Sequence, residues 1–208
     1  MTRQPPIIFC PEMVKAAYES RKTMTRRIEG LKVLNAHPER WRFTGWVEGK
    51  AVFENSTGYP VAIKPRYRVG DECWIKEVWA TNKQYDNLPP RQIPPCAEIW
   101  FPDELGWEHD KHNRGKVRTS RFMCKWMARR WLRITKVNDP ERVNAISIND
   151  ICAEGVCDTR TPQNEIVETY HEKFAQLWDS LHKKPDERFE HGPWAFSYEF
   201  EMIEGKPK

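Results

Sequence analysis

The chain has 208 residues, and its 34 Lys and Arg against 30 Asp and Glu give a formal net charge of +4. Hydrophobic residues make up 39% and aromatic residues 12%, with ten Trp, which excludes a disordered chain. No apolar run approaches the ~20 residues that cross a bilayer, and the first residues lack the apolar segment of a signal peptide. We therefore expect a folded, cytoplasmic protein with no membrane contact, built as a single domain over residues 1–208.

The first third of the chain predicts a strand, a helix, an extended segment and a hairpin. Residues 7–9 are short and apolar, and Pro11 then occupies a position that the first turn of a helix tolerates. This helix is expected to end near Ser20, and an extended segment over 23–28 follows it. Residues 41–54 are typical of a hairpin with a turn at Glu48-Gly49-Lys50.

The middle of the chain predicts one further strand and then loses its pattern. Gly70-Asp71 makes a turn into a strand over 72–79. Between residues 82 and 114 the pairs Pro89-Pro90 and Pro94-Pro95 exclude a central strand, and no period is sustained. We expect an insertion or a flexible loop there.

The last third predicts two strands around two helices. A strand is expected over 131–137, then a short helix capped by Ser147 and ended by Glu154 before Gly155. A longer helix is expected to start at Thr161-Pro162, and the clearest alternation predicts a final strand over 194–203. Because no βαβ repeat is visible, the fold class is α+β, a mixed and mostly antiparallel β-barrel decorated with helices.

The six Cys are scattered, without a C-x-x-C pair, so we expect reduced thiols rather than a disulfide framework. Only two spacings resemble half of a metal site, His109-x-x-His112 and Cys152-x4-Cys157, and neither has a second half. We expect neither a metal nor a cofactor.

Positive charge is concentrated between Arg114 and Lys136, where nine basic residues occur without an acidic one. Aromatic residues are interleaved among them, so the stretch offers cations for phosphates and rings for base stacking. The alternative is a solvated face whose aromatics point into the core. The candidate nucleic-acid-binding residues are Arg118, Arg121, Lys125, Trp126 and Arg129.

The segment Arg21–Arg27 places an amine, hydroxyls and guanidinium groups in seven residues, and it resembles the G-R-K-T-x-T-x-R signature of ASCH-domain proteins. Ser20 stands where that signature usually has glycine, and Gly70-Asp71 matches the Gly-Asp turn of the family. The similarity is greatest to the larger phage and prophage members and runs along the chain, whereas 82–114 matches nothing. The other matching positions are Pro11–Val14, Trp74–Trp79, Lys125–Trp126, Arg129, Glu154–Gly155, Leu177–Trp178 and Gly192–Trp194.

The resemblance implies a PUA-like β-barrel and two directions of activity. Some small members resemble amidohydrolases that deacetylate N4-acetylcytidine, others resemble ribonucleases, and many have no assigned activity. The catalytic set of the amidohydrolases corresponds here to Lys22, Thr25 and Glu154.

This set is chemically reasonable, because a partly desolvated lysine could act as a base on the Thr25 hydroxyl or on a water. Glu154 could carry the proton to the leaving amine, while Arg26 and Arg27 contact the substrate. The alternative is that the cations hold phosphates, Thr25 caps a turn, and Glu154 ends a helix or pairs with Lys22.

Strand alternation separates Glu77 from Trp74 and Lys76, so Glu77 either lines the same pocket or pairs with an arginine on the barrel wall.

Three functional hypotheses remain open from the sequence. The protein is an enzyme acting on a modified base or on RNA, a non-catalytic reader of nucleic acid, or a phage accessory protein that binds a host protein. The expected partner is a single-stranded nucleic acid or a modified nucleoside, and the sequence does not predict the oligomeric state.

Overall fold

The structure, a computed structural model, describes residues 2–104, 106–157 and 167–205. The chain forms two compact units, each assembled from separate stretches of sequence. Unit 1 comprises Met1–Tyr18, Gly70–Arg133 and Met202–Lys208, and unit 2 comprises Glu19–Val69 and Ile134–Glu201. The single domain expected over the whole chain stays a prediction.

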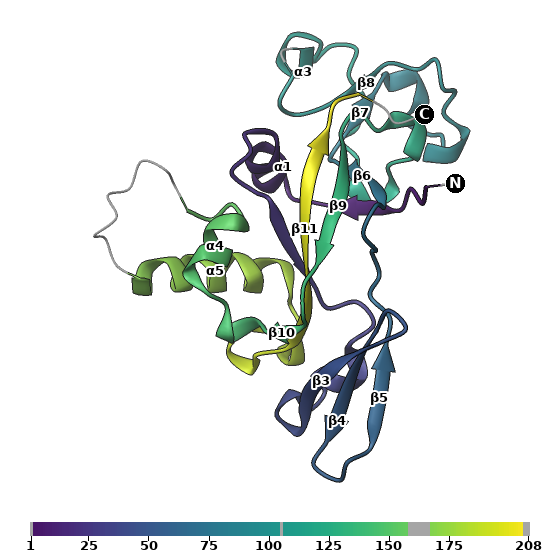
Figure 1. Ribbon diagram of the computed structural model, residues 1–208. Coiled ribbons are helices and arrows are strands. Elements are labelled where there is room, and N and C mark those ends of the chain that lie inside the picture. The colour runs from purple at the N-terminus through teal and green to yellow at the C-terminus, as the bar shows by residue number, and fades with distance from the viewer. Residues whose placement is uncertain (1, 105, 158–166, 206–208) are drawn as a thin grey trace. The chain divides into compact units, whose positions relative to one another are not determined.

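Unit 1 contains a parallel strand pair extended by an antiparallel one. Strand β1 runs parallel to β6, and β6 pairs with the first residues of β9 in antiparallel orientation. A separate two-stranded sheet joins β7 and β8 (Figure 1). The elements are β1 (Pro6–Ile8), α1 (Pro11–Tyr18), β6 (Glu72–Lys76), β7 (Ala80–Thr81), β8 (Ile99–Trp100), α3 (Gly106–His109), the start of β9 (Trp131–Val137) and short 3₁₀ helices at Lys83–Tyr85, Pro90–Gln92, Ser120–Phe122 and Lys125–Met127.

The core of unit 1 is rich in tryptophan and includes part of the 82–114 segment. Ile93 and Phe101, from that segment, are buried beside Trp79 and Trp131. Backbone bridges join Trp79 to Arg118 and Asn82 to Arg114, so the base of the segment is closed by main-chain hydrogen bonds. The 82–114 segment thus supplies apolar side chains to the core. The sequence did not predict this, because the apolar residues of the segment have no regular spacing.

Unit 2 is organised around the long strand β11. One edge of β11 pairs with β2 in antiparallel orientation, and β9 and β10 also pair with β11. The elements are β2 (Met24–Arg27), α2 (Lys32–Asn35), β3 (Trp41–Val47), β4 (Lys50–Asn55), β5 (Pro60–Ile63), the rest of β9, β10 (Glu141–Arg142), α4 (Ile148–Ala153), α5 (Val167–Leu181), most of β11 (Trp194–Ile203) and 3₁₀ helices at Pro38–Arg40, Val143–Ala145, Pro185–Glu187 and Phe189–His191.

The predicted hairpin is confirmed, and β5 extends it to a three-stranded sheet with the order β3-β4-β5 (Figure 1). Its turn places Glu48 at φ 49° and Gly49 at φ 70°. Two consecutive positive φ values match the right-handed twist of the flanking strands, which is the reason hairpins favour glycine here.

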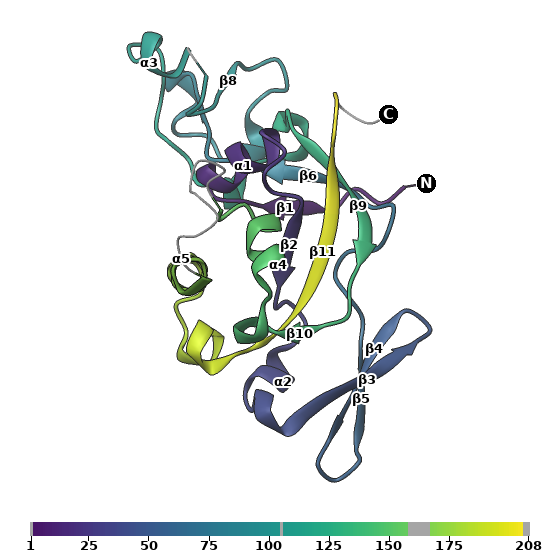
Figure 2. The same cartoon turned by 60° about the vertical axis from the view of Figure 1, so that its left-hand side comes forward.

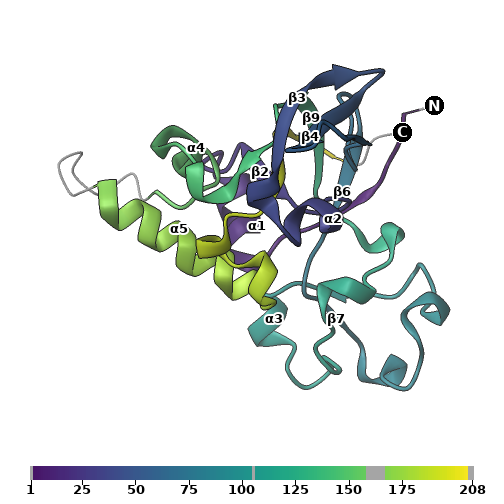
Figure 3. The same ribbon diagram turned by 90° about the horizontal axis from the view of Figure 1, so that it is seen from below.

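The helices of unit 2 pack against each other as their sequence patterns require. Ser147 caps α4 by accepting a hydrogen bond from the backbone N of Asp150 at 3.2 Å. Helix α4 packs on α5 over a shared apolar cluster that includes Ile151, Phe174 and Trp178 (Figure 3). The expected start of the second helix at Thr161 lies outside the described residues.

The α+β class is confirmed, and besides the hairpin, strands occur in the five other places where the sequence predicts them, as β1, β2, β6, β9 and β11. The expected barrel is not confirmed, because the strand pairings of the described residues give sheets of six, three and two strands and no closed barrel. Alternation of apolar and polar residues along a strand specifies which face is buried, but not whether the sheet closes into a barrel. The same pattern is therefore compatible with an open sheet. In the described part of the chain, no helix is long and apolar enough to cross a membrane.

Ser20 stands at the position where the signature of ASCH-domain proteins usually has glycine, and its backbone φ is 59°. A side chain in this left-handed region strains the backbone, so we expect Ser20→Gly to raise the free energy of unfolding by about 0.5–1 kcal/mol. Urea denaturation measures the change. The same substitution at Ser180, an exposed position within α5, is the control and should lower stability by a similar amount. Destabilisation by Ser20→Gly would contradict the assignment of strain to this residue.

Candidate functional site

The structure brings Lys22 and Glu154 into direct contact although 132 positions separate them. Lys22 precedes β2, Glu154 ends α4, and a backbone bridge joins the two residues. The ammonium of Lys22 donates to the Glu154 carboxylate at 2.6 Å and to its backbone carbonyl at 2.9 Å. Figure 2 shows α4 lying alongside β2, which is the packing that makes this contact possible.

Arg26 joins the same cluster from β2 and reaches three carboxylates. Its guanidinium contacts Glu154 at 3.2 Å and Asp150 at 2.7 Å, and its Nε donates to Glu141 at 3.0 Å. Burial alone would lower the pKa of Arg26, but the charges of Glu154, Glu141 and Asp150 outweigh it and raise the pKa. Arg26 therefore stays charged and holds β10 and α4 against β2.

Lys22, Arg26 and Glu154 are almost completely covered, whereas the side chains of Glu141 and Asp150 are 32% and 30% exposed. Lys22 is 3% exposed, Arg26 4% and Glu154 6%. A buried charge is tolerated only when it is paired and hydrogen-bonded, and here two cations face three carboxylates. Lys22 and Arg26 thus have protein partners in the positions where the sequence suggested contacts to phosphate or substrate.

Thr25 does not join this cluster. In the β2–β11 pairing it lies opposite Tyr198, while Arg27 lies opposite Phe196. Successive side chains of a strand point to opposite faces, so Thr25 and Arg27 share the face away from Arg26. Burial raises the pKa of Tyr198, whose ring lies on the Thr25 side. Of the predicted catalytic set, the structure therefore unites Lys22 with Glu154 only.

A disulfide between Cys152 and Cys157 encloses the turn that carries Glu154. The expectation of reduced thiols is wrong for this pair. Gly155 has φ 83° and reverses the chain after α4, which brings the two Cα atoms to 4.7 Å. The spacing that resembled half of a metal site is thus a local crosslink, and no group of three or more His, Cys, Asp or Glu in the described ranges is arranged to hold a metal ion.

Glu77 belongs to unit 1, where it is paired with arginines. It is 5% exposed and accepts hydrogen bonds from Arg129 at 2.9 Å and Arg130 at 2.6 Å. Asp103 and Glu104 bind the outer side of the same guanidinium groups. These contacts agree with the arginine-paired alternative for Glu77.

The basic stretch 114–136 is divided between internal and exposed residues. Arg118 is buried and donates to the backbone carbonyls of Tyr85 and Asp86. Arg129 is engaged by carboxylates, and Trp126 packs against the unit 1 core.

Five cations of the stretch are exposed, namely Lys116, Arg121, Lys125, Arg133 and Lys136. Of these, Arg121 and Lys125 flank Phe122 in the sequence, and Phe122 is 60% exposed. Only this part of the stretch offers cations and an aromatic ring to solvent in the combination that the sequence suggested.

Sequence reasoning missed Glu141 and Asp150 as partners of Arg26. Asp150 carried a signal, because it stands at the third position of the capped helix, but its carboxylate serves Arg26 rather than the helix end. A buried arginine on a strand requires carboxylate partners, yet nothing in the local sequence identifies which ones.

No family model matches the chain, and no curated protein matches it significantly. Among solved structures, the crystal structure of protein EF3133 from Enterococcus faecalis V583, of family DUF984, is similar with a TM-score of 0.43 and 11% identity. The similarity covers 96% of this chain and 76% of that one.

We expect Glu154→Gln to lower the free energy of unfolding by about 3–5 kcal/mol, because Lys22 and Arg26 both lose a buried counter-charge. Urea denaturation measures the loss. Glu199→Gln is the control, since Glu199 pairs with Lys136 in an exposed ion pair and its loss should cost less than about 1 kcal/mol. Equal losses of unfolding free energy in the two variants would show that burial does not determine how much the ion pairs of Glu154 stabilise the protein.

Proposed function

We propose that the protein is a hydrolase of N4-acylated cytidine, and that the Lys22–Glu154 pair moves the protons of the reaction. The observation that supports the proposal is the 2.6 Å hydrogen bond between the two side chains, held in a covered position by residues far apart in the sequence. The family resemblance of the Arg21–Arg27 segment gives the substrate class.

The pair can supply a base and an acid at once. Transfer of one proton along the Lys22–Glu154 hydrogen bond yields a neutral amine and a carboxylic acid. The amine then takes a proton from a water as the water oxygen attacks the acyl carbon, and the acid protonates N4 as the C–N bond breaks. The products are cytidine and the free carboxylic acid, so all atoms and protons balance.

Water, rather than the Thr25 hydroxyl, is the nucleophile in this mechanism. Thr25 lies on the opposite face of β2 from Arg26, which contacts the same carboxylate as Lys22. Lys22 and Glu154 are 3% and 6% exposed, so the mechanism requires a state of the protein in which both are more accessible.

Incubation with N4-acetylcytidine should release cytidine and acetate, measured by liquid chromatography and mass spectrometry. Lys22→Met should lower the rate by about 10²–10⁴-fold, the usual contribution of a general acid–base group. Thr25→Val should change it less than tenfold if water is the nucleophile, and a large loss would restore Thr25 to that role.

The control for this experiment is Lys136→Met, which removes an exposed lysine of unit 2 and should leave the rate unchanged. Circular dichroism shows whether each variant is folded. Absence of turnover by the folded wild-type protein would reject the hydrolase and leave recognition without catalysis.

A second candidate function is binding of single-stranded nucleic acid by unit 1. The observation that favours it is the exposure of Phe122 between the exposed cations Arg121 and Lys125. An aromatic ring stacks on bases and the cations neutralise phosphates, the two contributions that dominate such binding.

Replacing Arg121 and Lys125 together by Ala should weaken binding of a single-stranded RNA and reduce the slope of log K against log salt by about 1.4, or about 0.7 per cation. Fluorescence polarisation measures both quantities. Arg129→Ala should leave the slope unchanged, because that side chain is bound to Glu77 and Asp103. Unchanged affinity and slope in the double variant would identify the stretch as a solvated face.

A further inference from the structure

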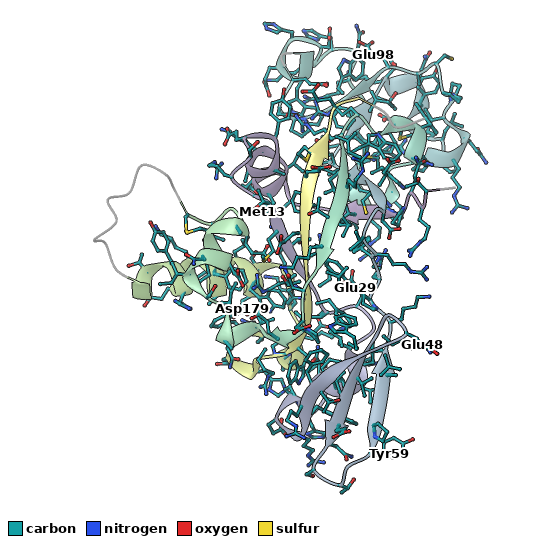
Figure 4. The ribbon with its side chains drawn as sticks, viewed as in Figure 1. Met13, Glu29, Glu48, Tyr59, Glu98 and Asp179 are labelled. Carbon is teal, nitrogen blue, oxygen red and sulfur yellow. A yellow bond between two sulfur atoms is a disulfide. The ribbon has the colours of Figure 1, made fainter. Side chains whose placement is uncertain are left out.

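Unit 2 contains an open cavity of about 630 Å³ that includes none of the Lys22, Arg26 and Glu154 side chains in its lining. It lies where β3 turns into β4. In Figure 4, Glu48 marks this turn, at the opposite end of the three-stranded sheet from Tyr59. The volume falls within the range of about 300–1,000 Å³ that small-molecule sites occupy. Its lining includes Trp46, Glu48, Lys64, Tyr67, Arg68 and Val137.

The aromatic wall of the cavity is held in place from behind. The indole Nε1 of Trp46 donates to Asp139 at 2.6 Å, and its ring lies 6.2 Å from that of Phe196. Trp46 nevertheless remains 37% exposed. Since its polar atom is already bonded, the surface that this side chain offers to a ligand is the flat apolar ring.

Two cations line the cavity because buried and exposed side chains alternate along residues 64–68. Pro65 and Tyr67 are buried, whereas Lys64, Arg66 and Arg68 are exposed, and the chain bends at Arg66 and Tyr67 after the end of β5. The Tyr67 ring packs against that of Tyr198 at 5.2 Å and anchors the segment. Lys64 and Arg68 then line the cavity, and against them its named lining has one acid, Glu48.

We propose that this cavity binds a nucleotide, with the base against Trp46 and the phosphate between Lys64 and Arg68. A simple anion would not contact the ring, and a neutral aromatic ligand would not contact the charges. A nucleotide satisfies both through stacking and charge-assisted hydrogen bonds. The carboxylate of Glu48 can accept a hydrogen bond from the exocyclic amine of adenine, cytosine or guanine.

The same chemistry occurs in a free mononucleotide and in one nucleotide of a single strand, so two probes are needed. Adenosine monophosphate is titrated by isothermal calorimetry, and a short fluorescein-labelled single-stranded RNA by fluorescence polarisation. Binding of both probes identifies a mononucleotide-sized site, whereas binding of the RNA alone that the cavity variants weaken identifies a site for a strand. Unphosphorylated adenosine should bind at least tenfold more weakly than adenosine monophosphate.

The variants separate the ring from the cations. Trp46→Ala should weaken binding about tenfold with the salt dependence unchanged. Lys64→Gln with Arg68→Gln should weaken it about tenfold and reduce the RNA salt slope by about 1.4. The second variant changes only exposed side chains and keeps the test valid if Trp46→Ala does not fold.

The matched control is Arg42→Gln with Lys50→Gln, which removes the same charge from exposed positions of the same sheet outside the cavity. It should retain wild-type affinity. Two results would overturn the proposal: failure of the wild-type protein to bind either probe, or equal losses in the cavity variant and this control. Both readouts measure binding and not turnover, so the outcome is independent of the proposed hydrolase activity.

Discussion

The buried cations Lys22 and Arg26, at the start of β2 and within it, require partners, and β10 and α4 of unit 2 supply them. Lys22 and Arg26 take carboxylates from β10 and from α4, which are remote in the sequence. Because removing a buried counter-charge costs far more than removing an exposed one, these contacts hold β10 and α4 on the strand. The packing of α4 on α5 then follows from the position of α4.

The same pairing limits what the cluster can do chemically. An ammonium bound to a carboxylate is not a base until its proton moves, and the 2.6 Å hydrogen bond is the shortest path for that movement. The arrangement that stabilises the fold is therefore also the one that would carry the proton. Arg26 is held by three carboxylates and fixes the orientation of Glu154.

Local patterns were sufficient to predict the strands β2, β9 and β11, the hairpin and the cap of α4, because each depends on neighbours in the sequence. They also carried one unused signal: alternation along β2 separates Thr25 from Arg26. The sequence did not predict which distant residues become partners when the chain folds. The carboxylates of Arg26 and Arg129 come from distant segments, and a stretch of cations without acids looks exposed until those segments are placed.

The crosslink between Cys152 and Cys157 encloses a separation of only five positions. A loop this short restricts the unfolded chain little, by about 2 kcal/mol in the chain-entropy description against almost 5 kcal/mol for a loop of about 100 residues. Its main effect is consequently local. It restricts the backbone conformations of Glu154 and Gly155 before the contact with Lys22 forms. Less conformational entropy is therefore lost when the Glu154 carboxylate binds Lys22.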